Sequence, residues 1–255
     1  MVLSLTILGL TFLAWSHRFI QDDAFIGFRY AYNLAHGNGL VWNGGERVEG
    51  YSNFLYTVAM SLPILLGLDP VGFSFCFGLL TFVLSLIFTY RLALYALGSR
   101  DAALIAVVLL GTNYTFSSFA TSGMETQLQA SLFAASIYTL LRSIDGGRWR
   151  PGPLITLSLL LSAALLTRPD SALLLVVVVP IALLCSLAPP LRLAERLATA
   201  LYLLLPLCLL VGAWTFWKVR YYGDILPNTY YVKVSSSNSL ARGAMYVYFF
   251  FQSYW

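Results

Sequence analysis

The chain has 255 residues, of which 59% are hydrophobic and only 10% are charged. Soluble domains carry about 25% charged residues, so this composition excludes an ordinary water-soluble domain and favours a bilayer as the surrounding medium. The net charge of +4 does not indicate a nucleic-acid-binding module, because the arginines are not clustered with stacking aromatic residues; the positive-inside bias of membrane proteins explains them better.

Neither the cysteines nor the histidines indicate a metal centre or a disulfide framework. Cys76, Cys185 and Cys208 lie inside apolar runs, where a cysteine is typically a small packing residue. His17 and His36 are far apart in the sequence and form no zinc-ligand pattern. We therefore expect neither a metal ion nor a cofactor; a divalent ion bound by an aspartate is the alternative.

The first predicted element is an apolar run from Val2 to Trp15. It is shorter than the roughly 20 residues with which a helix crosses a bilayer, and a secretory signal peptide is the alternative. No basic residue precedes the run and no small-residue cleavage site follows it. We therefore interpret the run as a first membrane span.

The second predicted element is an amphipathic helix over Asp22–His36. Ala24, Phe28 and Ala31 recur at helical spacing on one face, and polar residues occupy the others. Such a helix is typical of a membrane interface. Gly37 and the residues after it form a strong stop signal.

A further apolar helix is predicted over Asn53–Leu68, and longer apolar runs follow it. The predicted spans are Val71–Leu97, Ala102–Ser118, Gln127–Leu141, Leu154–Leu166, Ser171–Leu187 and Leu197–Trp217. Together they predict an all-α, polytopic transmembrane helix bundle. The aromatic run Met245–Trp255 has no helix stop after it, and we interpret residues 1–255 as the amino-terminal part of a longer protein.

The distribution of charge predicts the topology. If Asn53–Leu68 does not cross the membrane, the loops on one side carry seven basic and three acidic residues, and the other side carries eight of each. The first set is Arg91, Arg100, Asp101, Arg142, Asp145, Arg148, Arg150, Arg192, Glu195 and Arg196. A basic excess marks the cytoplasmic side. We therefore predict a re-entrant or interfacial helix at Asn53–Leu68 and a first extracytoplasmic loop at residues 17–70.

This topology places four polar clusters on the extracytoplasmic side. They are Asp22–Asp23, Ser122–Thr126, Thr167–Asp170 and Tyr221–Tyr231. The cytoplasmic loops are short and otherwise featureless. The sequence therefore predicts that any chemistry takes place on the outer face.

Two interpretations of Asp22 and Asp23 stay open at the level of residue chemistry. Carboxylates at the start of a helix are typical caps for free backbone N–H groups. A carboxylate at a partly desolvated membrane boundary also suits a general base that takes a proton from an acceptor hydroxyl.

Four cations are candidates for contact with a phosphate group: Arg29, Arg168, Lys218 and Arg220. Arginine binds phosphate bidentately and lysine binds it as a point charge, so cations near a leaving phosphate stabilise its growing negative charge. The alternative is an interfacial cation that extends toward water, or a local ion pair of Arg168 with Asp170.

A second group is predicted to bind the acceptor or the sugar: Glu125, Asp170, Asp224, Asn228 and Tyr230. For Glu125 the alternative is a first-turn acid favoured by the helix dipole. For Tyr230 the alternative is an aromatic belt residue. Glu46 and Glu49 are interpreted as solvated loop residues or partners of Arg47.

Five stretches resemble the GT-C fold glycosyltransferases, in particular the actinobacterial terminal β-(1→2)-arabinofuranosyltransferases. They are Asp22–Ala31 (DDAFIGFRYA), Gly39–Asn43 (GLVWN), Glu46–Leu55 (ERVEGYSNFL), Thr167–Asp170 (TRPD) and Gly223–Tyr231 (GDILPNTYY).

The resemblance implies an integral membrane enzyme that uses a polyprenyl-phosphate sugar, with an outer-loop aspartate as the base. That base corresponds to Asp22 or Asp23 here. The implied partners are the lipid-linked donor, a glycan or lipid acceptor and membrane lipids, with no nucleic acid. Longer members of the family continue into an outer carbohydrate-binding domain.

A non-enzymatic membrane protein is the competing hypothesis. A flippase or transporter subunit for lipid-linked sugars places its polar residues within spans near the midplane. In this sequence the polar motifs lie at the ends of predicted spans, which favours an enzyme.

Overall fold

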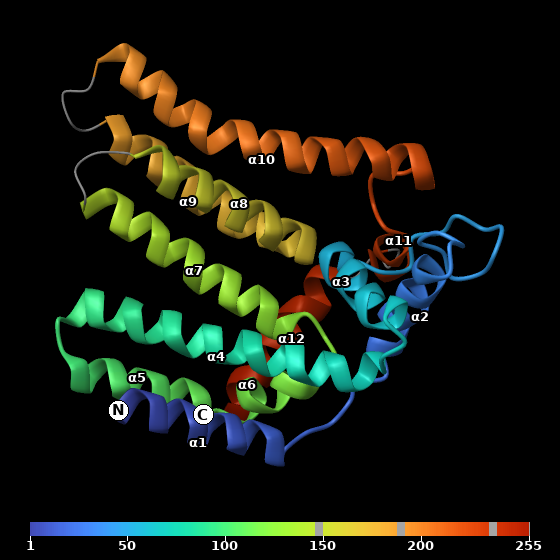
Figure 1. Ribbon diagram of the computed structural model, residues 1–255, viewed down its shortest axis with the longest axis horizontal. Helices are drawn as coiled ribbons and strands as arrows, with labels where there is room; N and C mark the ends of the chain where they lie inside the picture. Colours follow the sequence, from blue (N-terminus) through green and yellow to red (C-terminus); the bar gives the residue numbers. More distant parts are fainter. Residues whose placement is uncertain (146–149, 188–191, 235–238, 255) are drawn as a thin grey trace.

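The computed structural model describes residues 1–145, 150–187, 192–234 and 239–254 (Figure 1). Throughout these ranges the regular structure is helical, which confirms the predicted all-α class. The elements are α1 (Val2–Ser16), α2 (Ala24–Ala35), α3 (Phe54–Leu65), α4 (Pro70–Leu97), α5 (Arg100–Thr112), α6 (Tyr114–Ser118), η1 (Phe119–Thr121), α7 (Thr126–Asp145), α8 (Pro151–Thr167), η2 (Pro169–Ser171), α9 (Ala172–Leu187), α10 (Leu193–Tyr222), α11 (Asn228–Val234) and α12 (Ser239–Tyr254).

Among the described residues, two helices are long and apolar enough to cross a membrane, α4 with 28 residues and α10 with 30. They correspond to the spans predicted at Val71–Leu97 and Leu197–Trp217. The bent pair Arg100–Thr112 and Tyr114–Thr121 would be a third candidate span in the described residues if the two segments cross the membrane together. Shorter apolar helices, such as α1, α3 and α8, also lie in the described part of the chain. The chain therefore folds as a helical membrane protein.

The span predicted over Ala102–Ser118 is not one straight helix. The chain breaks at Asn113, and the segments Arg100–Thr112 and Tyr114–Thr121 are bent by 70° relative to each other. Asn113 has a non-helical backbone, with φ −59° and ψ 117°, and its side-chain oxygen accepts a 2.9 Å hydrogen bond from the N–H of Phe116. Asparagine satisfies the free N–H groups of a new helix in this way, so it ends one helix and begins the next.

The junction between α3 and α4 has an equally local cause. The carboxylate of Asp69 accepts hydrogen bonds from the N–H groups of Val71 and Gly72, at 3.2 and 2.7 Å. Pro70 occupies the first helical position, where its missing N–H is not needed. These residues start α4 as a new helix and leave α3 as a separate helix of 12 residues, too short to cross a bilayer by itself.

The long helices lie side by side in a bundle, and different loops lie at its two ends (Figure 1). The α4–α5 turn, the end of α7 and the starts of α8 and α10 lie at one end, together with most of the arginines of the predicted cytoplasmic set. Arg148 of that set lies outside the described residues. The opposite end holds α2, α3 and α11, and it contains the predicted site residues.

Candidate active site

Asp22 and Asp23 lie in the turn that enters α2, and both are exposed. Asp23 directly precedes the helix, yet its carboxylate caps none of the helical N–H groups. The Oδ1 atom of Asp22 instead accepts a 2.9 Å hydrogen bond from the N–H of Asp23. Helix capping therefore does not account for the Asp23 carboxylate.

This turn is fixed against the loop that precedes α7. The N–H of Gln21 donates a 2.9 Å hydrogen bond to the carbonyl of Ser122. Gly123 has a φ of +74°, and a Cβ atom there would overlap the side chains of Ile20 and Ala24. A glycine is therefore required where the two segments meet, and the turn of Asp22 packs on the loop that leads into Glu125.

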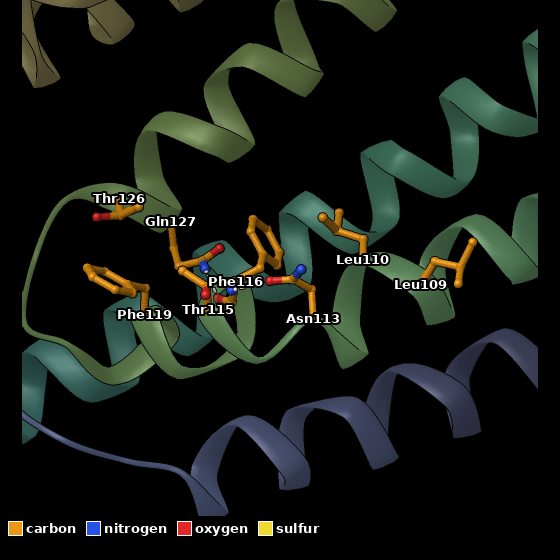
Figure 2. A pocket seen from close by; sticks show the side chains of 8 residues that line it. All are labelled: Leu109, Leu110, Asn113, Thr115, Phe116, Phe119, Thr126 and Gln127. Atoms are coloured by element: carbon orange, nitrogen blue, oxygen red, sulfur yellow. Dashed lines mark hydrogen bonds between the residues drawn. The ribbon is translucent and has the colours of Figure 1, made fainter. Parts of the chain in front are cut away.

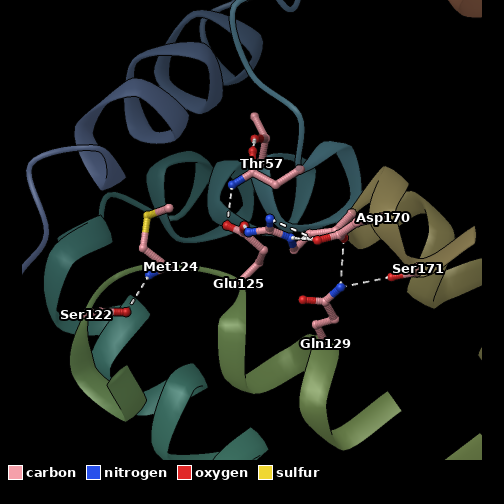
Figure 3. Close-up of polar contacts among 9 residues, drawn as sticks. Thr57, Ser122, Met124, Glu125, Gln129, Asp170 and Ser171 are labelled. Atoms are coloured by element: carbon pink, nitrogen blue, oxygen red, sulfur yellow. Dashed lines mark hydrogen bonds and ion pairs between the residues drawn. The ribbon is translucent and has the colours of Figure 1, made fainter. Parts of the chain in front are cut away.

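Glu125 is a buried carboxylate with a complete set of partners (Figure 3). Its side chain is 2% exposed, and Oε1 lies 2.9 Å from Nη1 of Arg168. The amide Nδ2 of Asn53 donates a 2.7 Å hydrogen bond to Oε2, and Thr57 donates in turn to Asn53. A buried charge is stable only when it is paired and hydrogen-bonded, so these contacts join α3, α7 and the end of α8.

Arg168 links Glu125 to the exposed Asp170. Its Nη2 atom lies 3.1 Å from Oδ2 of Asp170, and the amide of Gln129 donates a 2.9 Å hydrogen bond to Oδ1 (Figure 3). Burial lowers the pKa of Arg168, but the hydrogen bond to Asp170 and the charge of Glu125 outweigh it and raise the pKa overall. The structure thus brings a predicted phosphate-binding residue together with two predicted acceptor-binding residues.

Lys218 forms a buried ion pair with Glu49. The Nζ atom lies 2.9 Å from Oε2, and the side chains are 4% and 5% exposed. Burial raises the pKa of Glu49, and the hydrogen bond and charge of Lys218 oppose that rise. The interpretation of Glu49 as a solvated loop residue is wrong, because the buried lysine of α10 needs a carboxylate partner. Because the charge of Lys218 is already paired with Glu49, binding of a phosphate by Lys218 stays a prediction.

Arg29 and Arg220 are exposed and form no ion pair in the described part of the chain. The Nε atom of Arg29 donates a 3.2 Å hydrogen bond to the carbonyl of Trp42. Arg220 lies with its guanidinium carbon 5.9 Å from the ring centre of Phe216. Of the four predicted phosphate contacts, these two have a charge that no carboxylate neutralises in the described residues.

Arg29 lies at a mainly apolar cavity of about 620 Å³ between α2 and the α3–α4 junction. The cavity is lined by Phe25, Phe28, Arg29, Tyr32, Ile64, Gly67, Leu68, Asp69, Pro70 and Val71. α2 begins directly after Asp23, so the aspartate pair immediately precedes the helix that forms one wall of the cavity.

A second apolar cavity, of about 660 Å³, lies at the break between α5 and α6 (Figure 2). Its lining consists of Leu109, Leu110, Asn113, Thr115, Phe116, Phe119, Thr126 and Gln127. It contains none of the predicted site residues.

A third, polar cavity of about 270 Å³ brings together Asp224 and Asn228. Its other lining residues are Arg47, Val48, Glu49, Tyr222, Leu226 and Tyr231. Tyr230 is exposed beside it, with its ring centre 5.7 Å from that of Tyr231.

Asn53 and Gln129 are the site residues that the sequence interpretation missed. Each neutral amide touches a predicted carboxylate, Glu125 or Asp170. An isolated Asn or Gln in a helical run carries no signal of its partner.

As for metals, the described residues contain no group of three His, Cys, Asp or Glu side chains able to hold an ion.

The comparisons with known proteins give one distant relative. The chain is 27% identical over 246 residues to the terminal beta-(1->2)-arabinofuranosyltransferase of Mycobacterium tuberculosis. The matched region covers 92% of this chain and 38% of that protein, so the chain spans well under half the length of its relative. No family model and no solved structure matches the chain.

Proposed function

We propose that the chain is the membrane-embedded catalytic part of a glycosyltransferase. Its donor is a polyprenyl-phosphate sugar, its acceptor is an extracytoplasmic glycan or lipid, and arabinofuranose is the first sugar to test. The observation that carries the proposal is the exposed pair Asp22–Asp23 in a helical membrane protein. The Asp23 carboxylate caps no helix, and the turn of this pair packs against the loop before Glu125. The distant similarity to an arabinofuranosyltransferase supports the reaction class.

The proposed reaction is a single displacement with inversion. A carboxylate of Asp22 or Asp23 removes the proton of an acceptor hydroxyl as the oxygen attacks the anomeric carbon. The bond between the anomeric carbon and the phosphate oxygen breaks, and polyprenyl phosphate leaves with the electron pair. A nearby guanidinium stabilises the charge that grows on the phosphate.

The geometry favours Arg29 over Arg168 and Lys218 for the phosphate. Arg168 and Lys218 are already matched by carboxylates, whereas Arg29 lies exposed at the 620 Å³ apolar cavity. An apolar cavity beside an exposed guanidinium without a carboxylate partner in the described residues suits an amphiphile with a hydrocarbon tail and an anionic head. In this proposal Arg168 is a positioning residue that holds Glu125 and Asp170.

The aspartate pair is tested by replacing each carboxylate with its amide. We expect the double variant Asp22→Asn/Asp23→Asn to lower sugar transfer by about 10²- to 10⁴-fold, because general-base catalysis contributes factors of that size. The measurement is sugar transfer from a panel of polyprenyl-phosphate sugars by the full-length protein in nanodiscs. Glu46→Gln, an exposed loop variant, is the matched control. Full activity in the double variant would refute the base assignment.

The donor cavity is tested separately through Arg29. We expect Arg29→Gln to raise the KM for the donor by roughly 10- to 100-fold, because hydrogen bonds to charged groups contribute about 1.5–3 kcal/mol. A polyprenyl phosphate with a photoreactive tail should label α2 and the α3–α4 junction. Labelling confined to the cavity between α5 and α6 would move the lipid tail there and contradict this placement.

A further inference from the structure

The polar cavity at the end of α10 is built from three segments that are tied to one another. The N–H of Asn228 donates a 3.0 Å hydrogen bond to the carbonyl of Glu49, which joins α11 to the first loop. The Glu49–Lys218 ion pair joins the same loop to α10. The guanidinium carbon of Arg47 lies 4.6 Å from the ring centre of Tyr221. The wall of the cavity is therefore held from several sides.

Asp224 is fixed in orientation within this cavity. Its Oδ1 atom accepts a hydrogen bond from the N–H of Leu226, at 3.2 Å, and its Oδ2 atom accepts one from the hydroxyl of Tyr231, at 2.9 Å. These two hydrogen bonds lower the pKa of Asp224 below its usual value. The carboxylate is thus ionised and keeps acceptor capacity toward the cavity, since each carboxylate oxygen accepts more than one hydrogen bond.

The charges around the cavity balance. Glu49 is neutralised by Lys218, and the remaining charged lining residues are Arg47 and Asp224, of opposite sign. The lining therefore offers donors and acceptors side by side without an excess of positive charge. A hydroxyl group, which donates and accepts, matches this lining, whereas a phosphate needs donors alone.

We propose that this cavity binds one uncharged sugar ring of the acceptor, at a subsite distinct from Asp22 and Asp23; the acceptor role rests on the proposed function. Its volume of about 270 Å³ lies just below the roughly 300 Å³ of sites for drug-sized ligands, which suits a single ring. Tyr222 and Tyr231 supply aromatic surface for the C–H face of the sugar, and Arg47, Asp224 and Asn228 bind its hydroxyls.

The test is direct binding of neutral oligosaccharides, measured without any donor. Full-length protein in nanodiscs is titrated with arabinofuranosyl, galactofuranosyl and mannosyl oligosaccharides, and binding is followed by saturation-transfer NMR. We expect Asp224→Asn and Arg47→Gln each to weaken binding about tenfold, the loss of one hydrogen bond to a charged group. Glu46→Gln, in the same loop but outside the lining, should bind as the wild type does. A monodisperse elution profile and an unchanged Tm establish that each variant is folded.

The outcomes separate this inference from the proposed function. Asp22→Asn/Asp23→Asn should lose transfer but keep oligosaccharide binding. Normal binding in both cavity variants overturns the inference, as does the absence of binding by the wild type across the panel. Displacement of a bound oligosaccharide by inorganic phosphate at equal concentration also overturns it. Oligosaccharide binding that depends on Asp224, without transfer from any donor, supports the subsite and counts against the transferase.

Discussion

The Glu49–Lys218 ion pair shows how two charged side chains hold the first loop against α10 at the candidate site. Lys218 is the one lysine of α10, and the helix positions it among aromatic side chains, with Nζ 5.0 Å from the ring centre of Trp214. Its burial removes it from water, and the carboxylate of Glu49 replaces that lost hydration. The first loop is therefore held against α10 by charge as well as by packing.

Removing one partner of this pair should destabilise the protein strongly. We expect Lys218→Met or Glu49→Gln alone to lower the free energy of unfolding, by about 3–5 kcal/mol for Lys218→Met, because the remaining charge is buried without a partner. The double variant should be more stable than Lys218→Met alone. Thermal unfolding in detergent measures these differences. Arg220→Met, at an exposed cation of the same helix, should change stability by less than about 0.5 kcal/mol; an equal loss there would contradict the ion-pair argument.

Asp224 provides a prediction about pH. Hydrogen bonds from the N–H of Leu226 and the hydroxyl of Tyr231 lower its pKa below the usual 3.8. The folded state thus favours the ionised form, so the stabilisation is present above the unfolded-state pKa and is lost as pH falls through the lower folded-state value. The Tm difference between wild type and Asp224→Asn should be constant from about pH 5 to 7 and shrink below about pH 4. A difference that grows with acidification would contradict this assignment.

At the scale of elements, α4 and η1 approach so closely that backbone meets backbone at one point. A Cβ atom on Gly78 would overlap the backbone carbonyl oxygen of Ala120. Backbone cannot move aside as a flexible side chain can, so only glycine allows this approach. The contact fixes η1, and with it the loop that leads to Glu125, against α4.

Gly78→Ala should therefore destabilise the protein by about 1–3 kcal/mol, even though alanine favours the helix. Gly212→Ala in α10 is the matched control, since its Cβ would meet no atom within 4 Å. That variant should be neutral or more stable by up to about 1 kcal/mol. Thermal unfolding compares the two, and equal effects would mean that helix propensity rather than the close approach decides the outcome.

The sequence predicted elements better than it predicted contacts between them. Apolar length and stop signals located α4 and α10 because these signals are local. The break at Asn113 escaped because one asparagine within a predicted span does not by itself end a helix, and only the capping geometry starts the next one. The partners of Glu125 lie 72 and 43 residues away, and no local pattern specifies such pairs.

At the scale of the whole molecule, the fold places the polar motifs at one end of the bundle. Gln21, next to Asp22, is bonded to Ser122 in the loop before Glu125, and Glu125 is paired with Arg168. The end of α10 adds the polar cavity. Arg100, Arg150 and Arg192 stand at helix starts at the other end (Figure 1). This separation agrees with the predicted topology, in which the arginine-bearing end is cytoplasmic.

The topology itself is tested by thiol labelling from opposite sides of the membrane. In a background with all three native cysteines replaced by alanine, single cysteines are placed at Asn43, in the loop beside α2, and at Ser99, in the α4–α5 turn. Both positions are exposed and lie at opposite ends of the bundle (Figure 1). An impermeant maleimide added to intact cells should label Asn43→Cys and leave Ser99→Cys unlabelled until the membrane is permeabilised.

Because the arginines and the site residues occupy opposite ends, labelling of Ser99→Cys alone would place the site in the cytoplasm and refute an extracytoplasmic transferase. Labelling of both positions from one side would refute the arrangement of α4 across the bilayer.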